Sequence, residues 1–341
     1  MSHRFAAHVL IAVLFTLPIG SAWAQPTKLR FTLDWRFEGQ LAMFMLAKNR
    51  GYFEREGLDV QVDVGTGSAA SINRLVGGSH DIGTGDLTAL IEYFGNNPGP
   101  TRLQAVYLIY NRTPFAIHTL RGRGIEKPQD LAGKKIAAPV FDAIRKSFPV
   151  FAKAIGIDPK SVTFVSVDPA IRETMMLRGD ADASTGFELH RPLLVARGIK
   201  DEDIVTFRLA EHGFRMYGNA ILATSKLIEE NPKAVAAFVR ASNRALIDTI
   251  ANPAEAIKAN KEFDRLISEP LELEKLQVTL RAIDTDFARE RGLGDFDQGA
   301  LQTQVDDVFA TFGLNTKPSP DQIFNRAFLP PRAERAPRPG K

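Results

Sequence analysis

Two similar series of strand-like and helix-like runs follow one another along this chain, and this repeat constrains the fold more than any other feature. In the first series, apolar and polar residues alternate at 29–33 and 58–64, and a helical pattern lies between them at 38–50. The second series begins at Pro114 and continues to residue 209. Strands that alternate with helices are typical of α/β proteins, so the sequence predicts two α/β units.

Beyond a crossing strand at 219–224, the chain contains only helical patterns and loops. A segment without a sheet of its own must pack on a unit that is already formed. If it packs on the first unit, the chain crosses between the units near 110–114 and again near 217–220, and two crossings form a hinge. The helical patterns of this tail cover residues 232–250, 253–263, 271–283 and 298–312. In the second series, we expect the helix at 141–155 to break near Pro149.

Six short motifs occur in the order typical of a known family. They are LDWRFEG (33–39), GYFEREGLDV (51–60), GTGS (65–68), DIGTGD (81–86), DLAGKKI (130–136) and ADASTGF (181–187). With them the chain resembles the substrate-binding proteins of nitrate/sulfonate/taurine-type ABC importers, including the branch that binds thiamine pyrimidine precursors. The resemblance runs over roughly residues 28–250, which makes it more specific than any single motif.

The resemblance implies the two-lobed periplasmic binding protein fold (type II). Two α/β lobes would be joined by a two-strand hinge, with the helical C-terminal tail packed on lobe I. The expected divisions are 25–112 for the first part of lobe I, 113–218 for lobe II, 219–320 for the helical second part of lobe I, and 321–341 for a partly disordered tail. Within that tail, we expect the basic residues 332–341 to form a frayed end.

The first 24 residues have the pattern of a secretory signal peptide. A basic start precedes an apolar run at 9–17, and Ala22-Trp23-Ala24 supplies small residues at a cleavage site. We therefore expect cleavage near Ala24 and a periplasmic protein. The sequence contains no cysteine, which excludes disulfides, thiolate metal sites, thiol nucleophiles and a lipid-anchor cysteine.

Ligands of open α/β sheets bind beyond the carboxyl ends of the strands, and several segments occupy such positions. On lobe I, Trp35 offers a face for stacking, and Ser68 opens a helix that either caps itself or binds an acceptor group. Asp86 either accepts from a ligand amino group or caps the next helix. The expected ligand-binding residues of lobe I are Asp34, Trp35, Arg36, Phe37, Gln40, Gly67, Ser68 and Asp86.

Lobe II and the return crossing complete the predicted site. The expected residues there are Val140, Phe141, Asp142, Phe187, Glu188, Tyr217 and Asn219. The family often has Gly or Ser near position 140, so the bulkier residues here favour a larger or aromatic ligand over a tightly bound anion. A sulfonate or carboxylate remains the alternative, because four arginines could pair with it. These arginines are Arg36, Arg112, Arg145 and Arg215.

The sequence predicts a binding protein and no catalytic, cofactor or metal site. A relative with this fold makes the thiamine pyrimidine, but it depends on a cysteine-rich motif and iron, and this chain has no cysteine. The six histidines are scattered, and none forms an i, i+4 pair. The expected partners are a small-molecule ligand and an ABC permease with its ATPase, without nucleic acid, and the protein is expected to be a monomer. An extracytoplasmic sensor of the same ligand is a further alternative.

Overall fold

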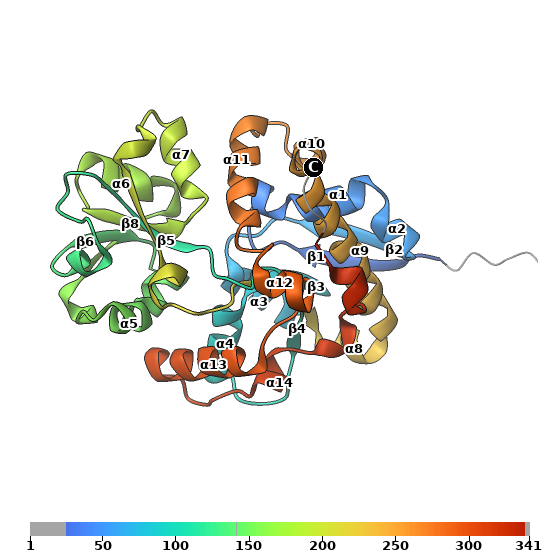
Figure 1. Cartoon of the computed structure of the whole chain (residues 1–341). Helices are drawn as coiled ribbons and strands as arrows, with labels where there is room; N and C mark the ends of the chain where they lie inside the picture. The colour runs from blue at the N-terminus through green and yellow to red at the C-terminus, as the bar shows by residue number, and fades with distance from the viewer. Residues whose placement is uncertain (1–24, 141, 338–341) are drawn as a thin grey trace, which may run out of the picture.

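The computed structural model describes residues 25–140 and 142–337. Within them the chain forms two lobes, which Figure 1 shows side by side. Each lobe is built on one five-stranded sheet. The residues expected to form a signal peptide lie outside the described part. The predicted class, a two-lobed α/β periplasmic binding protein fold with a two-strand hinge and a helical tail, is confirmed. The residue boundaries proposed for the lobes stay predictions.

Lobe I is built on the sheet with strand order β2-β1-β3-β10-β4. β1 is parallel to β2 and β3, whereas β10 runs antiparallel to both of its neighbours. Apolar residues of β1 and β2 lie on the buried faces, since Leu29, Phe31, Leu58 and Val60 are at most 2% exposed. The strands are β1 (Thr27–Thr32), β2 (Leu58–Asp63), β3 (Ile82–Asp86), β4 (Leu103–Leu108) and β10 (Asn219–Thr224). Its first helices are η1 (Gly39–Leu41), α1 (Ala42–Asn49), α2 (Tyr52–Arg55), α3 (Ser68–Val76) and α4 (Leu87–Asn96).

Lobe II repeats this topology in the order β7-β6-β8-β5-β9. β6 is parallel to β7 and β8, and β5, the strand that enters the lobe, is antiparallel to β8 and β9. The strands are β5 (Phe115–Leu120), β6 (Lys135–Ala138), β7 (Thr163–Ser166), β8 (Ala183–Phe187) and β9 (Ile204–Arg208). The helices are η2 (Pro128–Leu131), α5 (Ala143–Ile155), η3 (Pro159–Ser161), η4 (Pro169–Ile171), α6 (Arg172–Arg178), α7 (His190–Ala196), η5 (Asp201–Asp203) and η6 (Leu209–His212).

Two crossing segments join the lobes and are hydrogen-bonded to each other. The Gly218 amide donates to the Tyr110 carbonyl at 3.0 Å, and the Thr113 amide donates to the Met216 carbonyl at 3.1 Å. A Cβ added to Gly218 would lie 3.1 Å from the Tyr110 side chain, so the close approach of the two segments favours glycine there. These paired segments form the predicted two-strand hinge.

The helical tail packs mainly on lobe I. The Phe238 ring of α9 lies 4.9 Å from the rings of Phe31 and Phe53, which places α9 on the β1–α2 side of the sheet. Two further helices also reach lobe II, because α11 contacts α7 and α13 contacts α5. The tail consists of α8 (Ser225–Glu230), α9 (Pro232–Ala251), α10 (Pro253–Phe263), α11 (Glu269–Leu280), α12 (Asp286–Arg291), α13 (Gln298–Phe312), α14 (Pro320–Ile323), η7 (Arg326–Phe328) and η8 (Arg332–Arg335).

One local expectation was wrong. α5 continues through Pro149 without a break, because the packing of the buried Phe148 and Phe151 on the core outweighs the lost hydrogen bond and the steric conflict that the proline introduces. Of the residues 332–341 that were expected to fray, the structure describes 332–337, and the partly disordered tail at 321–341 stays a prediction. The Arg335 guanidinium is buried and donates to the carbonyls of Pro330 and Leu293, both at 2.7 Å, so these hydrogen bonds fix the segment on lobe I.

Candidate ligand-binding site

Asp34 organises the edge of lobe I where the strands end. The hydroxyl of Thr84 donates to Asp34 Oδ1 at 2.6 Å, and the hydroxyl of Ser68 donates to Oδ2 at 3.0 Å. The amide group of Asn219 also donates to Oδ2. The Gly67 amide donates to the Asp34 carbonyl at 2.7 Å. Asp34 thus links β1, β3, β10 and the start of α3. Four of the predicted residues lie together here, namely Asp34, Gly67, Ser68 and Asn219.

The loop after β1 carries a second polar network that reaches the tail. The indole N–H of Trp35 donates to Glu38 Oε1 at 3.1 Å. Lys275 of α11 donates to Glu38 Oε2 at 2.5 Å and to Glu272 Oε1 at 2.9 Å. Glu272 Oε2 accepts from the Gly39 amide at 2.6 Å. Helix α11 therefore holds Trp35 and its loop in place.

Burial and charge act in opposite directions on Glu38. Burial alone would raise the pKa of its carboxyl group. The Lys275 ammonium and the hydrogen bonds from Lys275 and Trp35 outweigh this effect and hold that pKa below its usual value. Glu38 is therefore ionised at neutral pH and keeps Lys275 paired.

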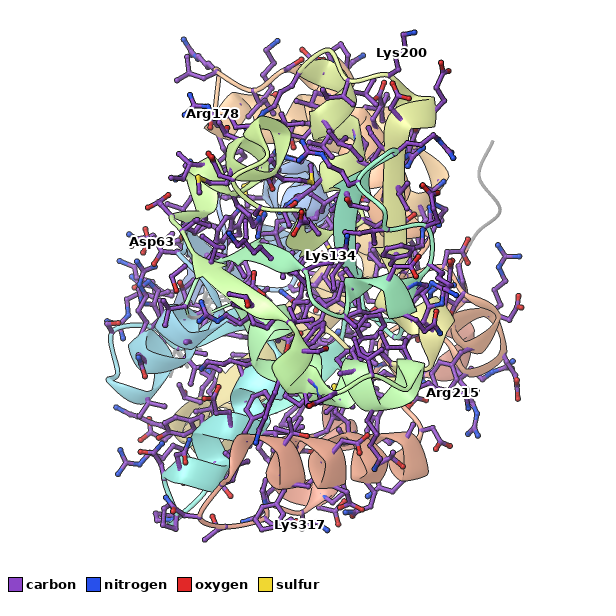
Figure 2. The ribbon with its side chains drawn as sticks, turned by 90° about the vertical axis from the view of Figure 1, so that its left-hand side faces the viewer. Asp63, Lys134, Arg178, Lys200, Arg215 and Lys317 are labelled. Atoms are coloured by element: carbon purple, nitrogen blue, oxygen red, sulfur yellow. The ribbon has the colours of Figure 1, made fainter. Side chains whose placement is uncertain are left out.

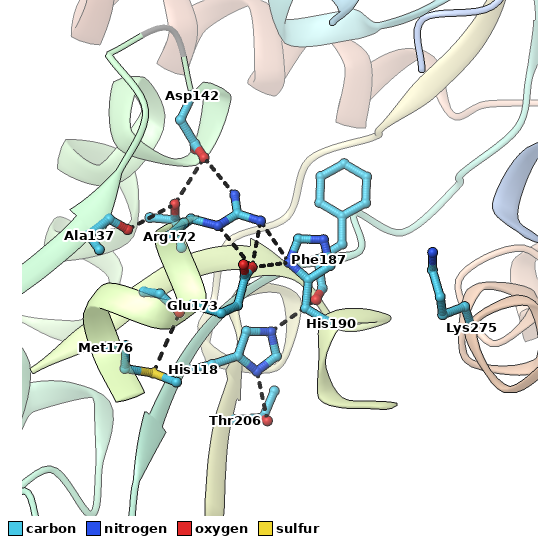
Figure 3. Close-up of polar contacts among 12 residues, drawn as sticks. His118, Ala137, Asp142, Arg172, Glu173, Met176, Phe187, His190, Thr206 and Lys275 are labelled. Atoms are coloured by element: carbon cyan, nitrogen blue, oxygen red, sulfur yellow. Dashed lines mark hydrogen bonds and ion pairs between the residues drawn. The ribbon is translucent and has the colours of Figure 1, made fainter. Parts of the chain in front are cut away.

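Lobe II presents a cluster built around Arg172, the first residue of α6 (Figure 3). The guanidinium donates to Glu173 Oε1 through Nη2 at 2.9 Å and through Nε at 3.1 Å. Its Nη1 lies 3.4 Å from Asp142 Oδ2, and its Nη2 lies 2.8 Å from His190 Nδ1. Asp142 further accepts from the Thr185 hydroxyl at 2.9 Å and caps α5. One cation thus joins the starts of three helices at the ends of β6 and β8.

The cluster also fixes the charge of its members. Burial alone would raise the pKa of the Glu173 carboxyl, but the charge of the Arg172 guanidinium holds it below its usual range. Burial lowers the pKa of His190, and the charge of Arg172 lowers it further, against the opposing effect of Glu173. Burial lowers the pKa of His118 to about 3. At neutral pH, Glu173 is therefore ionised and both histidines are neutral.

Three aromatic rings follow one another beside this cluster. The rings of Phe187 and His190 are 6.3 Å apart with an interplanar angle of 16°, and those of His190 and His118 are 6.3 Å apart at 27°. His118 Nε2 lies 2.9 Å from the Phe187 carbonyl oxygen, and its Nδ1 lies 3.1 Å from the Thr206 hydroxyl. Phe187 is half-buried at the end of the row. The row therefore presents Phe187 at the carboxyl end of β8, the predicted position.

The two sets of residues face each other across the lobes. Helix α11, which carries Lys275, contacts helix α7, which begins at His190. In Figure 3, Phe187 and His190 lie on the side of the lobe II cluster nearest Lys275. We call the place between Trp35, Glu38 and Lys275 on one side and Phe187 and His190 on the other the interlobe site.

A cross-lobe ion pair lies next to the interlobe site. Glu188, which follows Phe187, is 8% exposed, and its Oε1 lies 2.7 Å from Arg208 Nε and 3.3 Å from Arg281 Nη2. Arg281 follows α11 of the tail, whereas Glu188 belongs to lobe II. Lys146 of α5 and Glu92 of α4 form another pair between the lobes, at 2.8 Å. These pairs bind the lobes in the arrangement described here.

Asp86 and Gln40, predicted from lobe I, are buried, and one oxygen of each has no hydrogen-bond partner within residues 25–140 and 142–337. Asp86 Oδ1 caps α4 by accepting from the Thr88 amide at 2.8 Å, and Oδ2 is the oxygen that no described residue contacts by a hydrogen bond. Burial raises the pKa of Asp86 to about 6. Phe37 is half-buried against the Phe263 ring at 5.8 Å, which directs it to the tail.

The other predicted residues are placed in different ways. Val140 is 65% exposed on the loop before α5, and Phe141 lies outside the described residues. The Tyr217 hydroxyl accepts from the Asp297 amide at 2.9 Å, which ties Tyr217 to the loop before α13. Arg36 is exposed.

The remaining candidate arginines have other partners or face solvent. Arg112 pairs with Glu211 at 3.1 Å, and Arg145 donates to the Ser166 hydroxyl at 2.9 Å. Arg215 is exposed and lies at the edge of the molecule in Figure 2.

Sequence reasoning missed Arg172, Glu173, His190, His118 and Lys275. Each comes from the start or the face of an element whose neighbours in space are distant in the sequence. His190 comes three residues after the ADASTGF motif, and this short distance was the one sequence signal that could have pointed to a residue of the cluster.

Among residues 25–140 and 142–337, no three potential ligands of the His, Cys, Asp and Glu types are grouped to hold a metal ion. In the same part of the chain, every helix is too short or too polar to cross a membrane.

The two lobes, their paired crossing segments and the strand order of each sheet have the periplasmic binding protein fold. A family model described as NMT1/THI5 like matches residues 38–256. Because this match covers more than half of the sequence, the chain belongs to the NMT1/THI5-like family.

The individual relatives reported next have low sequence identity to this chain. The riboflavin-binding protein RibY of Chloroflexus aurantiacus is 25% identical over 316 residues, covering 90% of this chain and 88% of that protein. The 4-amino-5-hydroxymethyl-2-methylpyrimidine phosphate synthase of Schizosaccharomyces pombe is 25% identical over 264 residues, 73% of each chain. The periplasmic aliphatic sulphonate binding protein SsuA from Escherichia coli superimposes with a TM-score of 0.71 at 14% identity, covering 90% of this chain and 94% of that one, which shows the fold alone.

Proposed function

We propose that this protein is the periplasmic solute-binding component of an ABC importer and that it captures a flat, polar aromatic or heterocyclic ligand between its lobes. The protein would work as a monomer and pass the unchanged ligand to a permease with its ATPase. The observation that carries the proposal is the interlobe site itself. Trp35 follows β1 of lobe I and Phe187 ends β8 of lobe II, and each is hydrogen-bonded to a polar side chain, Glu38 for Trp35 and His118 for the Phe187 carbonyl.

The physical cycle follows from the hinge. With the lobes apart, a ligand reaches the rings and polar groups of one lobe, and rotation about the two crossing segments brings the other lobe onto it. The pairs Glu188–Arg281 and Glu92–Lys146 join the lobes when these are together. Because such pairs are partly exposed, each contributes little alone, and the ligand's own contacts decide the balance between the two states.

Two relatives support the heterocyclic ligand. One is named a riboflavin-binding protein, and another is named as a synthase of a substituted pyrimidine phosphate. Both names point to planar nitrogen heterocycles. The second name also makes catalysis the alternative function, which the experiment below must separate from binding.

A ligand screen tests the proposal. Purified protein is mixed with riboflavin, 4-amino-5-hydroxymethyl-2-methylpyrimidine, aromatic carboxylates and alkanesulfonates, and its melting temperature is measured. A ligand present at about 100 times its Kd stabilises the folded state by about 2.7 kcal/mol, so a true ligand gives a clear shift. Calorimetry should then give one ligand per chain, and mass spectrometry should recover the ligand unchanged. A converted product would instead favour the enzyme, and a set of sulfonates as the only hits would contradict the heterocyclic class.

A further inference from the structure

His190 stands out among the residues of the interlobe site because one of its ring nitrogens is unused. Its Nδ1 lies 2.8 Å from Arg172 Nη2 and 3.1 Å from Glu173 Oε1. No hydrogen bond joins its Nε2 to any of residues 25–140 and 142–337, because the contacts of the ring with Arg172 and Glu173 both involve Nδ1. The side chain is 20% exposed, whereas Glu173 is 3% exposed. The imidazole thus has one nitrogen anchored in the cluster and one open to the site.

The anchoring determines which nitrogen carries the proton. A guanidinium has no lone pair, so Nδ1 can only accept from Arg172. Glu173 Oε1 already receives two N–H groups from Arg172 and needs no third donor from the ring. The neutral imidazole therefore carries its single proton on Nε2, as a donor that faces the interlobe site.

The backbone beneath the ring fixes where this donor lies. A Cβ added to Gly186 of β8 would lie 2.4 Å from His190 Nδ1 and 3.2 Å from Cε1. Only glycine at this position lets the imidazole lie directly on the strand, next to Phe187. The ring therefore has a defined position relative to any group that stacks on Phe187.

The charges around the site indicate the class of ligand. Lys275 contacts two carboxylates, Glu38 and Glu272. Arg172 likewise contacts two, Glu173 and Asp142. Next to the site, Arg208 and Arg281 share the single carboxylate of Glu188. These groups therefore comprise five carboxylates and four cations, so a bound anion would face a small negative excess, whereas a neutral ring would not.

We propose that His190 contacts the ligand directly: its Nε2–H donates to a carbonyl oxygen or ring nitrogen on the edge of a neutral planar heterocycle that lies against Phe187. Arg172 and Glu173 are positioning residues that hold the imidazole. This inference rests on the proposed function and deepens it, because it names the ligand class and a specificity-determining residue.

Calorimetry with riboflavin as the neutral probe and ethanesulfonate as the anionic probe tests the inference. His190→Phe keeps a ring in the stack but removes the donor, and we expect riboflavin affinity to fall about tenfold. His190→Gln keeps an amide N–H near the Nε2 position and should stay within about threefold of the unaltered protein. His80→Gln, a histidine of lobe I paired with Asp63, is the matched control and should bind normally. Circular dichroism confirms that each variant is folded.

Two further measurements do not depend on His190→Phe. In Gly186→Ala the new methyl group displaces the imidazole without changing its chemistry, so we expect a similar loss of riboflavin affinity. The ¹⁵N shifts of the His190 ring should show a protonated Nε2 and an unprotonated Nδ1. A protonated Nδ1, or equal riboflavin affinity in His190→Phe and the unaltered protein, overturns the role of His190 and leaves the proposed function standing. Binding of ethanesulfonate alone overturns the ligand class, and binding of no solute in the screen overturns the proposed function together with this inference.

Discussion

The buried carboxyl group of Asp86 should make the stability of this protein depend on pH in an unusual direction. Burial raises the pKa of Asp86 to about 6 in the folded state, against an ordinary value of 3.8. The folded state therefore holds this proton more tightly than the unfolded chain does. The resulting stabilisation is fully present below about pH 4 and is lost as the pH rises through about 6. A difference of about two pKa units corresponds to about 3 kcal/mol in the free energy of unfolding.

Asp86→Asn isolates this effect because the amide cannot ionise. Its Oδ1 can still cap α4 by accepting from the Thr88 amide, so the helix start is kept. Between pH 4.5 and 7.5, the stability of Asp86→Asn relative to the unaltered protein should rise by about 2 kcal/mol, the part of the full effect that falls in this interval. Urea unfolding at several pH values, without ligand, measures the difference and cancels the titration of all other groups.

Asp86→Ala provides the control. It removes the charge and the cap together, so its stability should follow the same pH dependence as Asp86→Asn but lie lower by about 1 kcal/mol at every pH. A difference between Asp86→Asn and the unaltered protein that stays constant with pH, or changes in the opposite direction, would refute the reasoning. It would mean that Asp86 Oδ2 has a partner in solution, such as a water molecule.

Three further changes test other parts of the site. Trp35→Ala should weaken binding of the true ligand about tenfold, measured by calorimetry, with little loss of stability because the indole is only half-buried. Lys275→Met leaves two carboxylates unpaired and should cost about 3 kcal/mol in urea unfolding, and adding Glu272→Gln should recover part of this loss. Gly65→Ala would place a Cβ 2.1 Å from the Leu33 carbonyl oxygen and should cost about 2 kcal/mol; a normal melting temperature would contradict this contact.

The sequence predicted most elements of the fold because their signals are local. The helices at 253–263 and 298–312 have the expected bounds, since Asn252 and Asp297 cap their first turns and apolar residues recur on one face. Pro149 misled the prediction because the packing of α5 outweighs one missing hydrogen bond. Local signals suffice where the cap, the turn and the buried face lie within a few residues.

The sequence placed candidate residues only where they lie at strand ends. Trp35 and Phe187 occupy such positions, and their role in binding stays a prediction. Asp34, Ser68 and Asn219 lie together, and their polar groups hydrogen-bond one another. Contacts such as that between Gly39 and Glu272, 233 residues apart, have no local signal. The same holds for Arg172, His190 and Lys275, which become neighbours only when helices from different parts of the chain dock.

The position of β10 has a consequence for the order in which the chain can fold. This strand lies between β3 and β4 in the sheet of lobe I, yet it is the last strand of the sequence. During synthesis, which proceeds from the N-terminus, all five strands of lobe II are therefore complete while the sheet of lobe I still lacks β10. The edges of β3 and β4 keep unpaired backbone N–H and C=O groups until residue 224 has been synthesised. During that interval a chaperone, or a strand from a second copy of the chain, can pair with them.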